Sequence, residues 1–166
     1  EVDLLIRTAG LEPNDRILDL CCGQGRHCLE LSRRGYRHVT GVDRSRYLIR
    51  LARRRAKQQQ LKVSFHEGDA RKFRLTDSDF HCVAMMGNSF GYFDREEDDL
   101  AVLRAVIRAL GPGGGVVALD IASGDWMRQH FAPRSWEWVD QNQFVCRERS
   151  LSADATRLIS REVVVH

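Results

Sequence analysis

The sequence predicts an α/β fold in which helices cover both faces of a parallel sheet, with an antiparallel hairpin at the C-terminal end. Three observations predict it. Short apolar runs alternate with amphipathic helical stretches as far as residue 122, several of these runs end in an acidic residue, and the first run leads into a glycine turn. At 166 residues, the chain is long enough for one domain with a substantial core.

The first part of the chain alternates strand and helix patterns over short connections. The expected elements are a helix tail at 2–9, strands at 16–20, 38–42 and 61–66, and helices at 25–35 and 45–60. Gly35 ends the helix before it, because glycine readily adopts the left-handed conformation of a C-cap. In the 45–60 stretch, Leu48, Leu51 and Ala52 keep a helical apolar spacing, which places the many arginines on the solvated face.

The pattern continues with a fourth and a fifth strand. The expected elements are a strand at 80–86, a loop at 87–94, a helix at 96–110 and a strand at 115–121. The predicted buried stripe of the 96–110 helix consists of Leu103, Val106, Ile107 and Leu110. The nearly continuous apolar runs 83–86 and 116–119 predict central strands buried on both faces.

After residue 122 the pattern changes. A short helix is expected at 124–131, followed by two strands at 143–151 and 156–165 around a turn. We expect residues 1–122 to form the ligand-binding core and 123–166 a lid or hairpin region of the same domain. The hairpin either closes the main sheet or covers a substrate. If it is a cover, the chain is a piece of a longer protein that lacks the last strands, and the open edge of 115–121 invites a homodimer.

Composition narrows the class of protein. No stretch approaches the ~18 apolar residues of a membrane span, and the five cysteines form no CxxC pair, so neither a membrane protein nor a zinc site is expected. A reducing cytoplasm is the expected location. The net charge of +3 is mild, and the arginine-rich stretch 44–57 has no interleaved aromatic residues, so a nucleic-acid partner is not favoured.

Acidic residues end three of the predicted strands. Asp19, Asp43 and Asp69 all fall at carboxyl ends, which parallel strands bring to one edge of the sheet, where ligands bind. Asp43 is placed to accept hydrogen bonds from a ribose diol, or alternatively to cap the helix that starts near Ser45. Asp69 could accept from an adenine amino group, or be an ordinary turn residue.

The turn Gly23-x-Gly25 follows a strand and opens a helix, where the missing Cβ atoms let a ligand approach the backbone. Cys28 stands where the dinucleotide fingerprint has its third glycine. Asp19 just before the turn is unfavourable for a pyrophosphate but suits a cationic ligand. The methionine amino group and the sulfonium of S-adenosyl-L-methionine are cationic, so this cofactor is favoured over NAD.

The pattern as a whole resembles the class I S-adenosylmethionine-dependent methyltransferases, which have a Rossmann-like core. The resemblance covers about residues 14–122, and its motifs are Asp19-Leu20-Cys21-Cys22-Gly23-Gln24-Gly25, Gly41-Val42-Asp43, Gly68-Asp69-Ala70, the segment 87–93 and Gly111-Pro112-Gly113-Gly114. It implies cofactor contacts from Asp19, Cys21, Gly23, Gly25, Arg26, Asp43, Arg44, Asp69, Ala70, Met86 and Gly87. Cys21 departs from the family pattern, in which many members have glycine.

The segment Gly87-Asn88-Ser89-Phe90 is similar to small-molecule N-methyltransferases of the glycine-methylating type. This resemblance implies methyl transfer to a small molecule, at nitrogen, by in-line displacement, with S-adenosyl-L-homocysteine as product. Candidate substrate contacts are Asn88, Tyr92, His27 and Arg134. The alternatives are an RNA methyltransferase that steers phosphates with the arginine helix, a nicotinamide-dependent oxidoreductase, and a cofactor-binding module without turnover.

Overall fold

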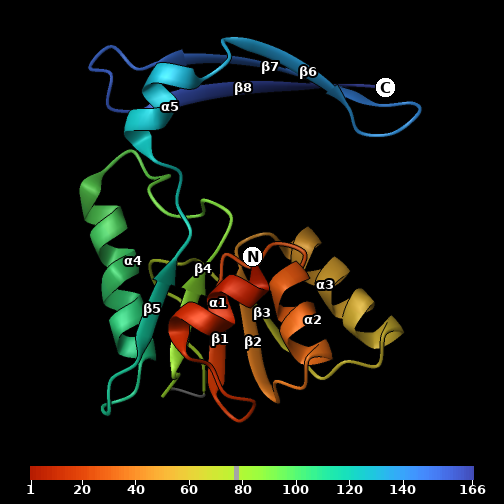
Figure 1. The fold of residues 1–166 in the computed structure, drawn as a ribbon, viewed down its shortest axis with the longest axis vertical. Helices are drawn as coiled ribbons and strands as arrows, with labels where there is room; N and C mark the ends of the chain where they lie inside the picture. The colour runs from red at the N-terminus through yellow and green to blue at the C-terminus, as the bar shows by residue number, and fades with distance from the viewer. Residues whose placement is uncertain (77–78) are drawn as a thin grey trace. The chain divides into compact units, whose positions relative to one another are not determined.

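A computed structural model describes residues 1–76 and 79–166 of the chain (Figure 1). The chain divides into two compact units, Glu1–Ile121 and Ala122–His166. Each unit is described by itself below.

The first unit is built on a five-stranded sheet in the order β3-β2-β1-β4-β5, in which every neighbouring pair is parallel. The strands are β1 (Arg16–Leu20), β2 (His38–Asp43), β3 (Ser64–Glu67), β4 (Cys82–Met85) and β5 (Val116–Leu119). The chain moves outward from β1 to β3 and then returns to the other side of β1 as β4. This reversal between β1 and β4 is the point at which open parallel sheets bind ligands.

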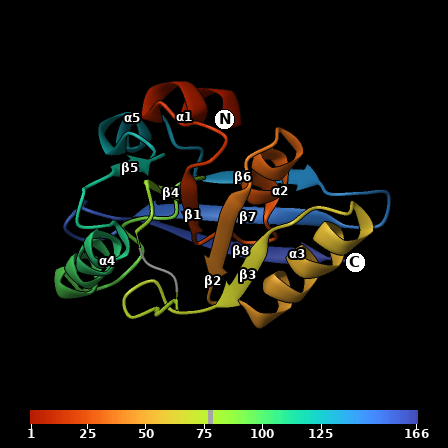
Figure 2. The same cartoon turned by 90° about the horizontal axis from the view of Figure 1, so that it is seen from below.

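Helices cover both faces of this sheet, as the alternating pattern predicts (Figure 2). They are α1 (Val2–Ala9), α2 (Arg26–Arg33), α3 (Arg46–Gln58) and α4 (Glu96–Ala109). Successive β1 residues serve opposite faces: Ile17 packs with residues of α1, α2 and α3, whereas Leu18 packs with residues of α4. The sheet is therefore buried between two apolar layers around β1.

Two packing predictions for this unit are wrong. The run 116–119 was expected to be a buried central strand, but Val116 and Val117 are 41% and 40% exposed. In the described part of the chain β5 pairs with β4 alone, so its apolar side chains lie at the rim of the sheet. In α4 the buried stripe is Val102, Ala105, Val106 and Ala109. The helix is thus rotated from the predicted face, leaving Ile107 66% exposed.

The second unit is a three-stranded antiparallel sheet with one helix, α5 (Gly124–His130). Its strands, in the order β6-β7-β8, are β6 (Arg134–Trp138), β7 (Phe144–Leu151) and β8 (Leu158–Val165). The predicted hairpin corresponds to β7 and β8, and these strands do not join the main sheet. The prediction missed β6, although the alternation of Trp136 and Trp138 with polar residues is typical of a strand. None of the helices described is long and apolar enough to cross a bilayer.

Candidate cofactor site

A cavity of about 370 Å³ lies at the carboxyl edge of the parallel sheet. Its walls come from the ends of β1, β2 and β4, the turns that follow β2 and β3, the loop after β4 and the first turns of α4. Five of the predicted cofactor residues line it, namely Cys21, Asp43, Arg44, Asp69 and Ala70. Residues that are far apart in the sequence therefore meet at the edge where the strand ends predicted a ligand.

The glycine turn begins in the left-handed conformation at Cys21, whose φ is 65°, and keeps it at Gly23 and Gly25. The Gly25 amide closes the turn by donating to the Cys22 carbonyl at 2.9 Å. The two glycines are required for different reasons. A Cβ on Gly25 would lie 2.6 Å from the Phe65 ring, so this glycine is required for packing, whereas a Cβ on Gly23 would meet nothing within 4 Å. Gly23 is thus the position that leaves room for a ligand.

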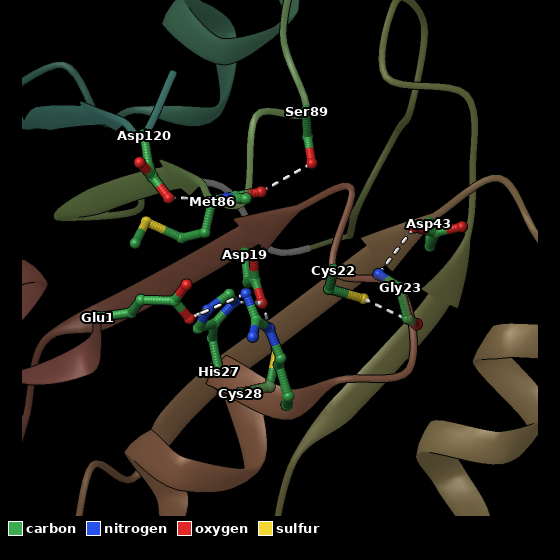
Figure 3. Close-up of polar contacts among 12 residues, drawn as sticks. Glu1, Asp19, Cys22, Gly23, His27, Cys28, Asp43, Met86, Ser89 and Asp120 are labelled. Atoms are coloured by element: carbon green, nitrogen blue, oxygen red, sulfur yellow. Dashed lines mark hydrogen bonds and ion pairs between the residues drawn. The ribbon is translucent and has the colours of Figure 1, made fainter. Parts of the chain in front are cut away.

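Asp43 is held rigidly at the end of β2. Its Oδ2 accepts a hydrogen bond from the Gly23 amide at 2.8 Å, and its Oδ1 accepts from the Ser45 amide at 2.7 Å (Figure 3). The helix cap is Ser45, whose hydroxyl accepts from the Leu48 amide at 3.3 Å. Asp43 therefore ties the glycine turn to β2, and each of its oxygens keeps a lone pair for a ligand.

Asp19 is buried beneath the glycine turn, with 1% of its surface exposed. The Cys28 thiol donates to its Oδ2 at 3.3 Å, the His27 Nδ1 lies 3.9 Å from the same oxygen, and its Oδ1 has no partner in the described part of the chain (Figure 3). Burial raises the pKa of Asp19 to about 6. A buried carboxylate with an unused oxygen is suited to a cationic or hydrogen-donating ligand group.

His27 and Arg26 open α2 next to Asp19. His27 is buried, and its Nε2 lies 3.1 Å from Glu1 Oε2, which Arg26 Nη2 also contacts at 2.8 Å. Neither residue lines the cavity. The structure thus places His27 beside Asp19, under the glycine turn.

Asp69 belongs to an ion-pair network behind the cavity wall. Arg71 Nη2 donates to its Oδ2 at 2.6 Å, and Arg71 Nη1 reaches Asp98 Oδ1 at 3.0 Å. These hydrogen bonds from Arg71 lower the pKa of Asp69 to about 2. The guanidinium carbon of Arg71 lies 4.6 Å from the centre of the Phe93 ring, which lines the cavity.

The loop after β4 is fixed by a residue that the sequence analysis missed. Asp120 Oδ2 accepts from the Gly87 amide at 3.0 Å, and its carbonyl accepts from the Asn88 amide at 2.8 Å (Figure 3). Ser89 Oγ donates to the Met86 carbonyl at 2.7 Å. The signal was available, because Asp120 directly follows an apolar strand, as Asp19, Asp43 and Asp69 do.

The predicted substrate contacts do not gather in one place. Tyr92 lines the cavity and is 70% exposed. Asn88 is exposed in the loop after β4 with a φ of 59°, and His27 is buried under Glu1. Arg134 belongs to the second unit, where its Nη2 pairs with Glu148 at 3.1 Å. Cys21 also lines the cavity, but burial raises the pKa of its thiol to about 12, which leaves it unsuited to act as a nucleophile.

Comparison with known proteins decides the family. The family described as "Methyltransferase domain" matches residues 17–114, which contain the glycine turn and the acidic strand ends. The chain belongs to the methyltransferase domain family. The matched segment ends just before β5, so it covers most of the parallel core, and the second unit lies outside it.

Relatives in this family carry methyltransferase names. The chain is 30% identical over 134 residues to the putative methyltransferase YqeM of Bacillus subtilis, covering 81% of the chain and 53% of the relative. It is 36% identical over 119 residues to the demethylmenaquinone methyltransferase of Leptospira interrogans, covering 68% of the chain and 46% of the relative. The chain therefore spans about half the length of these relatives.

Solved structures extend the similarity to the whole fold. An S-adenosylmethionine-dependent methyltransferase from Clostridium acetobutylicum aligns with a TM-score of 0.78 and 20% identity, over 99% of this chain and 71% of that one. At this identity the alignment demonstrates a shared fold. The predicted Rossmann-like class is confirmed.

Proposed function

We propose that this protein transfers a methyl group from S-adenosyl-L-methionine to a small-molecule acceptor. The observation that carries the proposal is the cavity at the carboxyl edge, lined by Asp43 and Asp69, with the half-satisfied carboxylate of Asp19 beneath the adjoining glycine turn. An adenosine with a cationic amino-acid tail matches this series of acceptors. Membership of a methyltransferase family supports the same conclusion and disfavours the oxidoreductase alternative.

The residues fit the parts of this cofactor. Asp43 would accept from the ribose hydroxyls, because its carboxylate faces the cavity and is oriented by two backbone amides. The backbone around Gly23 would hold the methionine moiety, with Asp19 supporting its ammonium group from below. Arg44 and Ala70 would flank the adenine, and Met86 and Gly87 would lie beside the cofactor after β4.

The cofactor, when bound, supplies an activated methyl group on a sulfonium, so the chain needs neither a nucleophile nor a metal of its own. Its contribution would be alignment of the two reactants and exclusion of water. The loop from Gly87 to Phe93 is suited to this task, since Asp120 and Ser89 fix its first residues and Phe90 and Phe93 line the cavity.

We further propose a nitrogen acceptor. The support is the resemblance of the 87–90 segment to N-methyltransferases, together with a fold shared with the sugar N-methyltransferase KedS8, at a TM-score of 0.72 and 22% identity. Other relatives are named for quinone substrates, among them 2-phytyl-1,4-naphtoquinone methyltransferase of Synechococcus elongatus, 33% identical over 125 residues. Tyr92, Asn88, His27 and Arg134 stay predicted substrate contacts.

A transfer assay with a radiolabelled methyl group tests the proposal. Purified protein is incubated with labelled S-adenosylmethionine and separate panels of primary amines, amino sugars, reduced quinones and RNA. Transfer to amines or amino sugars supports the proposal. Transfer to quinones alone contradicts the nitrogen acceptor, salt-sensitive transfer to RNA contradicts the small-molecule class, and tight cofactor binding without transfer to any panel favours a binding module.

A homodimer also stays a prediction. Its supporting observation is the outer edge of β5, where Val116, Val117 and Leu119 are each at least 40% exposed. Light scattering on the purified protein would detect it. A monodisperse monomer over a wide concentration range would contradict it.

A further inference from the structure

The carboxylate of Asp69 has no lone pair left for a ligand. A carboxylate offers about four acceptor positions. Arg71 uses all of them: its backbone amide donates to Oδ1 at 2.9 Å, its Nε to Oδ1 at 3.0 Å and to Oδ2 at 3.3 Å, and its Nη2 to Oδ2 at 2.6 Å. The role that the family resemblance implies for Asp69, acceptance from the adenine amino group, would require Arg71 to move.

Arg71 is held in place from two further sides. Its Nη1 donates to Asp98 Oδ1 at 3.0 Å, and its guanidinium stacks over the Phe93 ring. Turning Arg71 away from Asp69 would break an ion pair and a cation–π contact at once. Asp69 and Arg71 therefore act as a strut that holds Phe93 against the cavity.

A second carboxylate of the same cavity has the opposite property. Asp99 lies in the first turn of α4 and lines the cavity beside Ala70 and Val102. Its Oδ1 is buried, and in the described part of the chain it has no hydrogen-bond partner. A buried acceptor without a donor is destabilising, so a ligand that brings a donor to this oxygen gains the hydrogen bond and removes that penalty.

We infer that Asp99, not Asp69, accepts the hydrogen bond from the adenine 6-amino group and so selects adenosine over 6-oxo nucleosides. The inference rests on the proposed function, since it names the group that recognises the base of the proposed cofactor. Asp69 is then a positioning residue, which acts on the base through Arg71 and Phe93. The acidic first turn of α4 suits this role, because the helix N-terminus stabilises the charge of Asp99.

The test compares two ligands that differ at the 6-position of the purine. S-adenosylhomocysteine carries the amino group, whereas S-inosylhomocysteine carries a carbonyl oxygen that cannot donate. Calorimetric titration of the wild type should show a preference for S-adenosylhomocysteine of about tenfold or more, because an unpaired buried acceptor is left opposite the carbonyl.

Three variants separate the roles. Asp99→Asn should narrow this preference to about twofold or less, because the amide can turn its NH₂ toward the inosine oxygen. Asp69→Asn should weaken both ligands alike and leave the ratio unchanged. Asp98→Asn is the matched control, since it removes the same charge from the neighbouring residue and should also leave the ratio unchanged.

The outcomes separate this inference from the proposed function. A wild type that binds neither ligand overturns both. A wild type that binds both equally, or a preference lost in Asp69→Asn and kept in Asp99→Asn, overturns the inference and leaves the methyltransferase proposal standing. Circular dichroism checks that each variant folds. If Asp99→Asn does not fold, the ratio in Asp69→Asn decides, because its loss there would return the amino group to Asp69.

Discussion

Asp19 provides a direct test of the electrostatics beneath the glycine turn. The proposed change, Asp19→Asn, keeps the shape of the side chain and removes a charge from a site that is 1% exposed. The groups facing that charge are the Cys28 thiol at 3.3 Å and the His27 ring at 3.9 Å, and Oδ1 has no partner among the described residues. Burial therefore dominates, and it raises the pKa of Asp19 from 3.8 to about 6.

The sign and size of the effect follow from this shift. Below pH 3.8 the carboxyl is protonated in both the folded and the unfolded chain, so it carries no ionisation cost. As the pH rises toward about 6, the unfolded chain ionises first and the folded state loses stability relative to it. At 1.36 kcal/mol per pKa unit, the loss amounts to about 3 kcal/mol above pH 6.

Asp19→Asn removes this loss. We expect the variant to be more stable than the wild type by up to about 3 kcal/mol at pH 8, with the difference shrinking as the pH falls toward 4. Urea denaturation followed by circular dichroism measures the unfolding free energy at each pH. Asp94→Asn, on the exposed loop before α4, is the matched control and should show no such trend. A difference that stays constant from pH 4 to 8, or a variant less stable at pH 8, would refute the reasoning.

Three further predictions concern the turns and the helix cap around the site. Gly25→Ala should cost several kcal/mol of unfolding free energy, because a Cβ would lie 2.6 Å from Phe65 at a φ of 79°; Gly35→Ala, with a φ of 93° and open space, should cost about 1–2 kcal/mol in the same urea titration. Asp120→Ala removes the acceptor of the Gly87 amide and should weaken S-adenosylhomocysteine binding severalfold by calorimetry, whereas unchanged affinity would show that this loop does not shape the site. Ser45→Ala should lower the midpoint of urea denaturation by an amount equivalent to about 1 kcal/mol, because α3 loses its N-cap, and an unchanged midpoint would mean that the cap contributes nothing.

The sequence predicted the parallel core well because that prediction rests on local signals. Apolar runs that end in Asp19 and Asp43, with a glycine turn between them, specify strand ends, and parallel pairing then brings those ends to one edge. The cavity residues Arg44 and Ala70 followed from the same logic, since each directly follows a strand-end acid.

The errors arose where a side chain's environment depends on distant partners. No local pattern reveals that Gly25 is required by Phe65, or that Arg71 occupies the whole carboxylate of Asp69. The burial predicted for 116–119 failed for a similar reason, because apolar composition cannot tell a central strand from one at the rim of the sheet.

Calorimetric titration with S-adenosylhomocysteine and, separately, NAD, using the wild type and Asp43→Ala, tests the central claim most directly. Asp43 is the right residue to remove, because it is positioned by the glycine turn and faces the cavity. The account predicts micromolar binding of S-adenosylhomocysteine, no binding of NAD, and loss of binding in the variant. Binding of NAD alone, or equal affinity for S-adenosylhomocysteine in both proteins, would contradict it.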